Sequence, residues 1–218
     1  MQIQITTIKF PDLRFHASAG HKLRGYFGNL FKEHSSLLHN HLQDGTNNYK
    51  YPLVQYKVVN KIPYIIGINE GGKLLVELFL KIKELNIENE VYPVNAKNIS
   101  NQIIELIDTT ELFEYRFETL WMGLNQQNFN KYLKINIYER KKMLQNILIG
   151  NILSFYKGIS YTINQQILIK LDFIEHKTNF KNKEMFAFGG NFICNAILPD
   201  YIGLGKAVSR GFGCIIKK

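Results

Sequence analysis

Three histidines, His34, His39 and His41, lie close together near the start of the sequence. The last two flank one asparagine in a polar segment, and in an extended chain such residues point to the same side with Cα atoms about 6.5 Å apart. Imidazole titrates near neutral pH, so one ring can take the proton of a ribose 2′-hydroxyl while a second ring protonates the departing 5′-oxygen. This spacing therefore fits metal-free cleavage of RNA, with a 2′,3′-cyclic phosphate and a 5′-hydroxyl end as the products.

Two other interpretations of the same histidines stay open. Histidines in a polar loop are often only solvated, and a His-x-His pair can hold a divalent metal when a third ligand joins it. Asp44 or His34 could be that ligand. No other acidic residue or histidine stands at a recognisable ligand spacing, which disfavours the metal site.

A second group of special residues lies near the carboxyl end, in the segment 203–213, GLGKAVSRGFG. Its glycines, Gly203, Gly205, Gly211 and Gly213, allow positive φ angles, and the backbone N–H groups together with Lys206 and Arg210 can hold a phosphate. The segment lacks the spacer and the following helix of a Walker loop, and it is not GxGxxG after a strand, so a nucleotide cofactor is disfavoured. A glycine-rich turn between two strands is the alternative interpretation.

The net charge of the chain favours a polyanionic partner. It is +9 at a sequence pI of about 9.4, and clustered Lys and Arg release counterions when they bind phosphates. Charge alone does not separate RNA from DNA or from an acidic membrane, and a biased composition is an alternative cause. The sequence has no aromatic signature of an RNA-recognition strand, so base stacking on a sheet is not expected. The basic residues fall in three groups: Lys22, Arg24 and Lys32; Lys131, Lys134, Arg140, Lys141 and Lys142; Lys177, Lys181 and Lys183.

Composition and the first residues limit the class of protein. The start MQIQITTIKF lacks the basic and apolar regions of a signal peptide, and no apolar stretch approaches the ~20 residues that span a bilayer. We expect a cytoplasmic protein without membrane contact. Cys194 and Cys214 are flanked by apolar, strand-like residues, as is typical of buried reduced thiols.

Hydrophobic periodicity in the first half predicts the order strand, helix, strand, strand, helix, strand. The strands are expected at 2–9, 53–59, 63–68 and 90–96, with a polar loop at 39–51 and a hairpin turn around Asn60 and Lys61. The first helix begins near Ser18 as its cap and buries Leu23, Phe27, Leu30, Phe31 and His34; the second follows Gly71 and Gly72 and buries Leu74, Leu75, Leu78, Phe79, Ile82 and Leu85. This βαββαβ order is typical of a ferredoxin-like domain, the scaffold of RNA-recognition modules.

The second half is less regular. It has a strand-like region at 102–122, a helical region at 126–157 with Gly150 and Gly158 as possible breaks, and strands at 165–176, 184–197 and 213–217. This order is roughly βαβββ, which we interpret as a degraded copy of the first half. The predicted fold is therefore α+β, with tandem ferredoxin-like (RRM-like) domains at 1–98 and 99–218 and a carboxyl-terminal glycine-rich loop.

Both ends of the sequence resemble one known family. The helix segment 23–31, LRGYFGNLF, is similar to the first helix of the CRISPR-associated repeat endoribonucleases of the RAMP superfamily. The histidines after that helix stand where this family keeps its catalytic histidine, and the segment 203–213 resembles the family's carboxyl-terminal glycine signature. The strand pair at 52–70 is also similar, so that the resemblance covers most of the chain.

This resemblance implies a function as well as a fold. It implies an enzyme that binds precursor guide RNA and cuts each repeat without metal or cofactor, with His39 and His41 as base and acid in an order left open. His34 and Tyr26 are auxiliary candidates. The RNA-binding residues expected by position are Lys22, Arg24, Gly203, Gly205, Lys206, Arg210 and Gly211.

The resemblance also implies binding partners, and it leaves two alternative functions open. Repeat RNA is the expected partner, and other CRISPR effector subunits or a second copy of the chain are further ones. Because catalytic residues vary in this family, the first alternative is a non-catalytic RNA-binding subunit of an effector complex. The second is a metal-dependent phosphodiesterase that uses the histidine loop.

Overall fold

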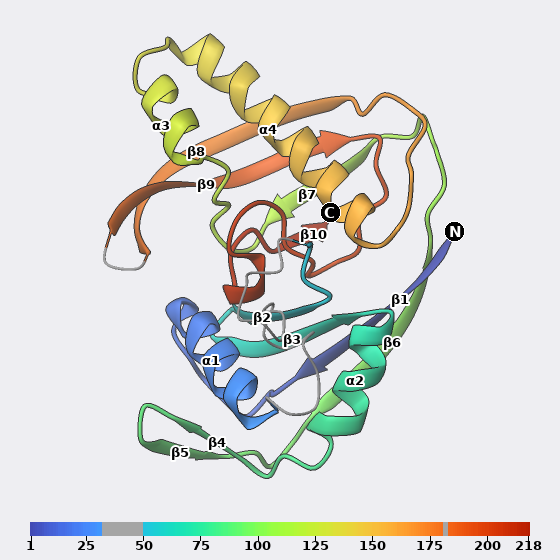
Figure 1. Cartoon of the computed structure of the whole chain (residues 1–218), viewed down its shortest axis with the longest axis vertical. Helices are drawn as coiled ribbons and strands as arrows, with labels where there is room; N and C mark the ends of the chain where they lie inside the picture. The colour runs from blue at the N-terminus through green and yellow to red at the C-terminus, as the bar shows by residue number, and fades with distance from the viewer. Residues whose placement is uncertain (32–49, 181–182) are drawn as a thin grey trace. The chain divides into compact units, whose positions relative to one another are not determined.

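Two units make up the chain, whose residues 1–31, 50–180 and 183–218 are described by a computed structural model (Figure 1). The first unit comprises Met1–Leu106 together with Val208–Gly211, and the second comprises Ile107–Ala207 and Phe212–Lys218. A four-residue piece from near the carboxyl end thus belongs to the first unit. Each unit is built on a four-stranded sheet.

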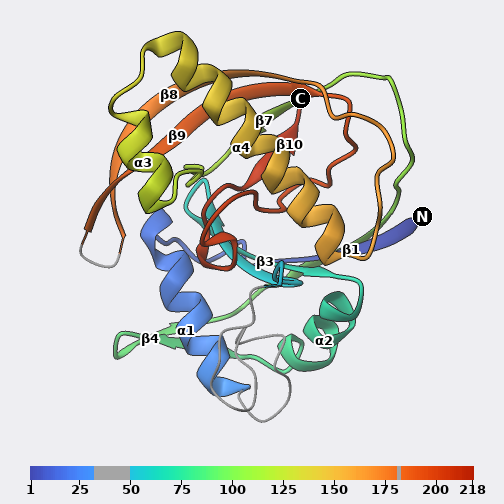
Figure 2. The same cartoon turned by 45° about the horizontal axis from the view of Figure 1, so that its top comes forward.

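The sheet of the first unit has the strand order β2-β3-β1-β6, and every neighbouring pair is antiparallel. Its strands are β1 (Gln2–Lys9), β2 (Val54–Val59), β3 (Ile62–Ile68) and β6 (Asn98–Glu105). Two helices, α1 (Gly20–Leu30) and α2 (Glu70–Phe79), share a core with this sheet (Figure 2). The rings of Phe27 on α1 and Phe79 on α2 lie 4.5 Å apart, so both helices cover the same face. This is the predicted ferredoxin-like arrangement.

The hairpin of β2 and β3 shows how local sequence determines this arrangement. Val59 pairs with Ile62, and Asn60 and Lys61 between them have φ angles of 51° and 65°. Two positive φ angles in a two-residue loop give a turn whose twist matches that of the flanking strands. The turn predicted at these two residues is confirmed.

A strand lies within the predicted range 90–96, but its predicted place as the fourth strand of the first sheet was wrong. Residues 90–96 do not join the first sheet; β5 (Glu90–Pro93) pairs only with β4 (Glu84–Ile87) in a separate hairpin. The fourth strand is β6, which pairs with β1 along its whole length, from Gln2↔Glu105 to Lys9↔Asn98. Apolar and polar residues alternate in both segments, 90–96 and 98–105. Such alternation predicts a strand but does not predict which strand it will pair with.

Helix boundaries also differ from the prediction in detail. A short 3₁₀ turn, η1 (Ala17–Ala19), precedes α1, and its cap is the His16 side chain, which accepts a hydrogen bond from the Ser18 backbone N–H. Ser18 is therefore not the cap, and Leu30 is exposed at the end of α1. Two residues predicted on the buried face of the second helix lie beyond the end of α2. Ile82 is in the connection that follows the helix and Leu85 is in β4, and both are buried.

The second unit repeats the topology of the first. Its strands β7 (Phe113–Phe117), β8 (Ile169–Phe180), β9 (Lys183–Cys194) and β10 (Ile215–Lys217) have the order β10-β7-β9-β8. Taken in chain order, this is the same spatial order as in the first sheet. Helices α3 (Gln126–Tyr132) and α4 (Ile137–Gly158) follow β7, whereas residues 195–214, described throughout, form no α-helix between β9 and β10. The interpretation of the second half as a degraded ferredoxin-like copy is confirmed.

Two element predictions in the second half were wrong. The region 102–122 is not one strand, since its first residues belong to β6 and only 113–117 form β7. Gly150 does not break the helix, because α4 runs through it to Gly158. The long helix is anchored at its start by a capping box, in which Asn136 and Glu139 each bond the other's backbone N–H.

Two glycines of this unit are expected to respond to alanine in opposite ways. A Cβ on Gly213 would lie 2.0 Å from the Leu204 carbonyl oxygen, and the residue has a φ of +64°. Gly213→Ala should therefore destabilise the protein by about 2 to 3 kcal/mol. Gly150, in mid-helix, has no heavy atom within 4 Å of an added Cβ, so Gly150→Ala should stabilise it by about 0.5 to 1 kcal/mol. Thermal unfolding midpoints of the two variants test this; equal shifts would contradict it.

Cys194 and Cys214 are free and fully buried, as predicted. Burial raises the pKa of the Cys194 thiol to about 11, so the thiol stays protonated and unreactive near neutral pH. Within the described part of the chain, no helix combines the length and apolar character that crossing a bilayer would require.

Candidate functional site

The predicted catalytic histidines fall in the segment 32–49. His34, His39 and His41 therefore lie outside the described residues, and their roles stay predictions. Among the residues that the structure does describe, no three His, Cys, Asp or Glu side chains gather where they could hold a metal ion. His16 and His21 are exposed at the start of α1.

The structure brings together two arginines that are far apart in the sequence. Arg24 lies on α1, and Arg210 lies in the 3₁₀ turn η3 (Val208–Arg210), which packs against α1 and β2 within the first unit. Burial lowers the pKa of the Arg24 guanidinium, and the nearby positive charge of Arg210 lowers it further. Both side chains are half-buried. Two neighbouring guanidinium groups can stabilise one bound oxyanion with both of their charges.

Glycines allow the close approach that places these arginines. A Cβ on Gly20 would lie 2.6 Å from the Arg210 carbonyl oxygen and 3.2 Å from the Cα of Gly211. Only a glycine at the first residue of α1 leaves room for that backbone. Arg24 follows Gly20 by one helical turn and so lies on the same face of α1. Gly211 has a φ of +103°, which favours glycine and lets the chain leave the turn there.

Tyr56 on β2 lies near Arg24. Its side chain is buried, and its hydroxyl group has no hydrogen-bond partner in the described structure. Burial raises the pKa of Tyr56 well above its ordinary value, and the charge of Arg24 acts in the opposite direction. The phenol is therefore neutral near neutral pH. Neither Tyr56 nor Gly20 was singled out from the sequence.

The other predicted residues of the glycine-rich segment belong to the second unit. Gly203 forms an isolated bridge with Cys214, and the backbone N–H of Lys206 donates to the Met122 carbonyl at 2.9 Å. Gly205 has a φ of +89°, and a Cβ there would lie 2.7 Å from the Trp121 Nε1 atom. Partial burial lowers the pKa of the Lys206 amine. These contacts give each glycine a packing role, and RNA binding by these residues stays a prediction.

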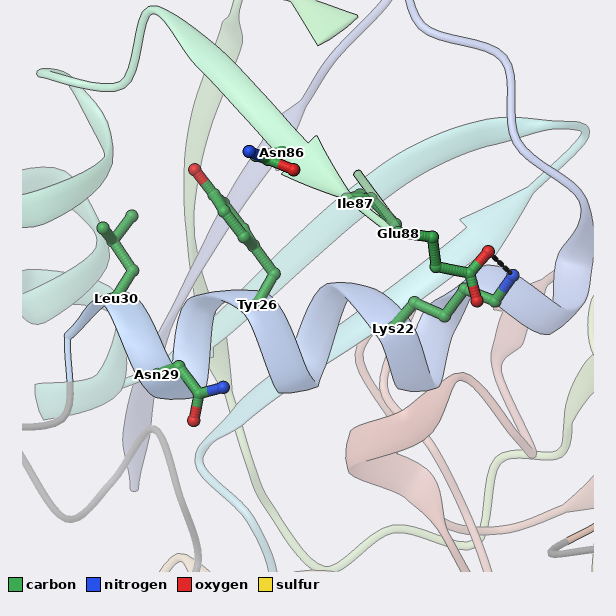
Figure 3. Close-up of a pocket in the computed structure, with 7 residues that line it drawn as sticks. All are labelled: Lys22, Tyr26, Asn29, Leu30, Asn86, Ile87 and Glu88. Atoms are coloured by element: carbon green, nitrogen blue, oxygen red, sulfur yellow. Dashed lines mark hydrogen bonds and ion pairs between the residues drawn. The ribbon is translucent and has the colours of Figure 1, made fainter. Parts of the chain in front are cut away.

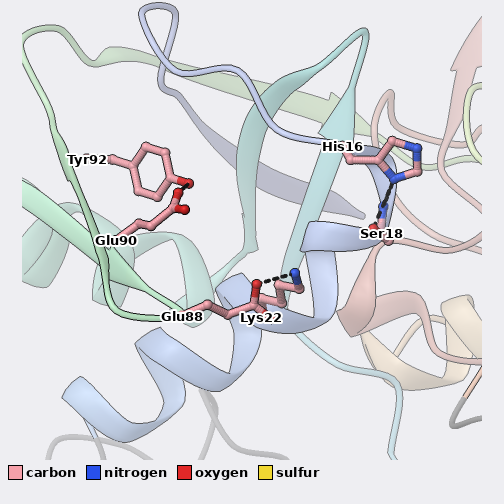
Figure 4. A network of polar contacts seen from close by, with 6 residues as sticks. All are labelled: His16, Ser18, Lys22, Glu88, Glu90 and Tyr92. Carbon is pink, nitrogen blue, oxygen red and sulfur yellow. Dashed lines mark hydrogen bonds and ion pairs between the residues drawn. The ribbon is translucent and has the colours of Figure 1, made fainter.

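Lys22 and Tyr26 line a separate pocket between α1 and β4 (Figure 3). Its volume is about 530 Å³, and the Tyr26 hydroxyl donates to the Glu84 carbonyl at 3.4 Å. The Lys22 amine pairs with Glu88 at 2.5 Å, near Glu90 and Tyr92, which also bond each other (Figure 4). Because the Lys22–Glu88 pair is partly exposed, it contributes little to stability. The auxiliary role of Tyr26 and the RNA contact of Lys22 stay predictions.

Comparison with known proteins covers both units. A model of the Cas6b N-terminal domain matches residues 1–105, and a model of the Cas6b C-terminal domain matches residues 108–218. A crystal structure of Cas6b is 34% identical with a TM-score of 0.96, and another, of the CRISPR RNA processing endoribonuclease Cas6b, is 32% identical with a TM-score of 0.82; each alignment covers 100% of both chains.

A curated relative comes from the archaeon Methanocaldococcus jannaschii, where it is an uncharacterized protein. It is 32% identical over 142 residues, which are 65% of this chain and 97% of the relative. Together with the two domain models, which leave hardly any residue unmatched, these similarities confirm the resemblance seen in the sequence. The chain belongs to the Cas6b family.

Proposed function

We propose that this chain is an endoribonuclease that binds CRISPR repeat RNA and cuts it within each repeat to produce CRISPR RNA. The observation that carries the proposal is the full-length similarity, at 32% identity, to a solved structure described as a CRISPR RNA processing endoribonuclease. In this proposal the enzyme acts in the cytoplasm. Other effector subunits and a second copy of the chain are further proposed partners.

The chemistry of the proposal is transesterification without metal. One imidazole, of His39 or His41, removes the proton of the ribose 2′-hydroxyl, and that oxygen attacks the adjacent phosphorus. The bond from phosphorus to the 5′-oxygen breaks, and the second imidazole, in its protonated form, gives its proton to that oxygen. The products carry a 2′,3′-cyclic phosphate and a 5′-hydroxyl group. The resemblance supports this, because these histidines follow 23–31 in the sequence, where the family keeps its catalytic histidine.

RNA binding is proposed for the Arg24 and Arg210 pair. Guanidinium groups form paired hydrogen bonds with phosphate oxygens, and we assign both arginines to one phosphate because η3 packs against α1. The formal charge of +9 supports attraction of RNA by the chain as a whole. The Lys206 side chain is proposed as a weaker contact to the RNA backbone, because the N–H groups of Leu204, Lys206 and Gly213 already donate to carbonyls of the protein.

The proposal is tested by incubating the protein with a repeat RNA from its source genome in excess chelator. Cleavage at one position, with end groups identified by mass spectrometry as a cyclic phosphate and a 5′-hydroxyl, is the expected result. Cleavage that requires an added divalent metal would favour the phosphodiesterase alternative. Tight binding without a cut under either condition would favour the non-catalytic RNA-binding subunit.

Arg24→Ala and Arg210→Ala are each expected to weaken RNA binding by about tenfold to a hundredfold, since each removes a charge-assisted contact. Each variant should also reduce the slope of log affinity against log salt, by at most about 0.7, the value for one phosphate of a single strand. Fluorescence anisotropy at several salt concentrations measures both quantities.

Arg14→Ala is the matched control for these variants. Arg14 is exposed in the same unit, and its guanidinium bonds the backbone carbonyls of Pro11 and Leu13. Its replacement should leave the salt slope unchanged. An unchanged slope in Arg24→Ala and Arg210→Ala as well would remove the arginine pair from the RNA site.

A further inference from the structure

Lys57 is a charged residue with no exposed surface, in the middle of β2. Burial of an amine is costly unless it is hydrogen-bonded, so the partners of such a side chain are informative. The Lys57 Nζ atom donates to the Val208 carbonyl oxygen at 2.8 Å. Val208 begins η3 and stands two residues before Arg210. The buried lysine therefore ties the second strand of the unit to a turn from near the carboxyl end.

The same turn is held from a second direction. Gly20 gives room for the Arg210 backbone against the start of α1, and a Cβ on Gly211 would lie 3.6 Å from the Tyr56 carbonyl oxygen. The turn is thus fixed by α1 on one side and by β2 on the other. Val208 is buried, whereas the Arg210 side chain keeps part of its surface exposed to solvent.

We propose that Lys57 is a positioning residue of the RNA site: its amino group holds the Val208 carbonyl, and this fixes η3 so that Arg210 stands beside Arg24. The proposal rests on the proposed function, because it assigns the arginine pair to an RNA phosphate. RNA does not reach Lys57, which has no accessible surface. Any effect of Lys57 on RNA binding is therefore indirect, and we assign it to the turn that its amino group bonds.

The salt dependence of RNA binding tests this role. Lys57→Met keeps most of the length of the side chain and removes the donor. We expect it to weaken RNA binding and to lower the salt slope by about as much as Arg210→Ala does. In the double variant with Arg210→Ala, the slope should fall no further than in Arg210→Ala alone. A solely structural lysine would lower the unfolding midpoint and leave the salt slope intact.

Val58→Ala is the matched control. Val58 is the next residue of β2, buried in the core on the opposite face of the strand, so its truncation destabilises the unit without touching the turn. It should lower the unfolding midpoint and keep the parental salt slope when binding is measured well below that midpoint. If Lys57→Met behaves like Val58→Ala, the positioning role is wrong.

The outcomes separate this proposal from the proposed function. If Arg210→Ala lowers the slope and Lys57→Met does not, only the positioning role falls. If Arg210→Ala has no effect on RNA binding, the arginine pair is not the RNA site. The positioning role of Lys57 is then wrong as well. Should Lys57→Met fail to fold, Gly20→Ala on α1 is the second variant. Its Cβ would push the Arg210 backbone away, so it too tests whether the position of the turn determines RNA binding. A parental slope in Gly20→Ala would then count against the proposal.

Discussion

Replacing His39 or His41 with alanine is expected to lower the single-turnover rate of repeat cleavage by about 10² to 10⁴, while the affinity for the RNA changes little. Each ring moves one proton in the proposed transition state, and water is a poor substitute for a positioned acid or base. Phosphate binding belongs to Arg24 and Arg210 in this proposal, so the dissociation constant should stay near that of the parent. Rapid-quench kinetics with enzyme in excess, alongside anisotropy, separate the two quantities.

His16→Ala is the control for these two variants. His16 is exposed, and its Nδ1 atom lies 2.9 Å from the Ser18 Oγ atom at the turn that precedes α1 (Figure 4). Its replacement should leave the cleavage rate within a small factor of the parental rate. Parental rates for both His39→Ala and His41→Ala would show that the pair does no chemistry.

The same variants can also tell the acid from the base. A substrate with sulfur in place of the 5′-oxygen at the cut has a leaving group that needs no proton. Such a substrate should restore much of the rate in the variant that lacks the acid and should not help the one that lacks the base. The result would assign His39 and His41 to their two roles.

Local sequence patterns were sufficient to predict most of the helices and strands of the first unit. Alternation in 2–9, the positive-φ turn at Asn60 and Lys61, and the stripe of Leu23 and Phe27 on α1 are short-range signals, and each appears in the structure where it was predicted. The fourth strand was misplaced because its position depends on β1, about a hundred residues away, and two alternating segments competed for it. Strand existence is a local property, whereas strand pairing is a long-range one.

In the candidate site, too, the residue types could be noted from the sequence, whereas their proximity could not. Arg24 and Arg210 were each noted from the sequence for their charge, yet only the fold shows that they meet. Lys57 was missed because an alternating strand is usually half exposed, so a lysine in it is expected to face water. All six residues of β2 are buried, which means that both of its faces are covered. The apolar residues beside Lys57, Val58 and Val59, were the signal available in the sequence.

A single 2′-deoxy nucleotide at the cut position is expected to abolish cleavage of the repeat RNA. Without the 2′-hydroxyl there is no internal nucleophile, and neither His39 nor His41 can supply one. The deoxy RNA should bind with nearly the affinity of the all-ribose RNA, because the arginine pair contacts phosphate and not the 2′-hydroxyl. Its cleavage under single-turnover conditions and its competition against the all-ribose substrate measure the two effects.

The control is the same RNA with the deoxy nucleotide placed one position beyond the cut, where the leaving 5′-oxygen is attached. That RNA should be cleaved at the parental rate, since its nucleophile is intact. A metal-activated water would attack phosphorus whether or not the 2′-hydroxyl is present. Cleavage of the first deoxy RNA at the usual position would therefore exclude the internal attack proposed for His39 and His41 and leave hydrolysis by an external water.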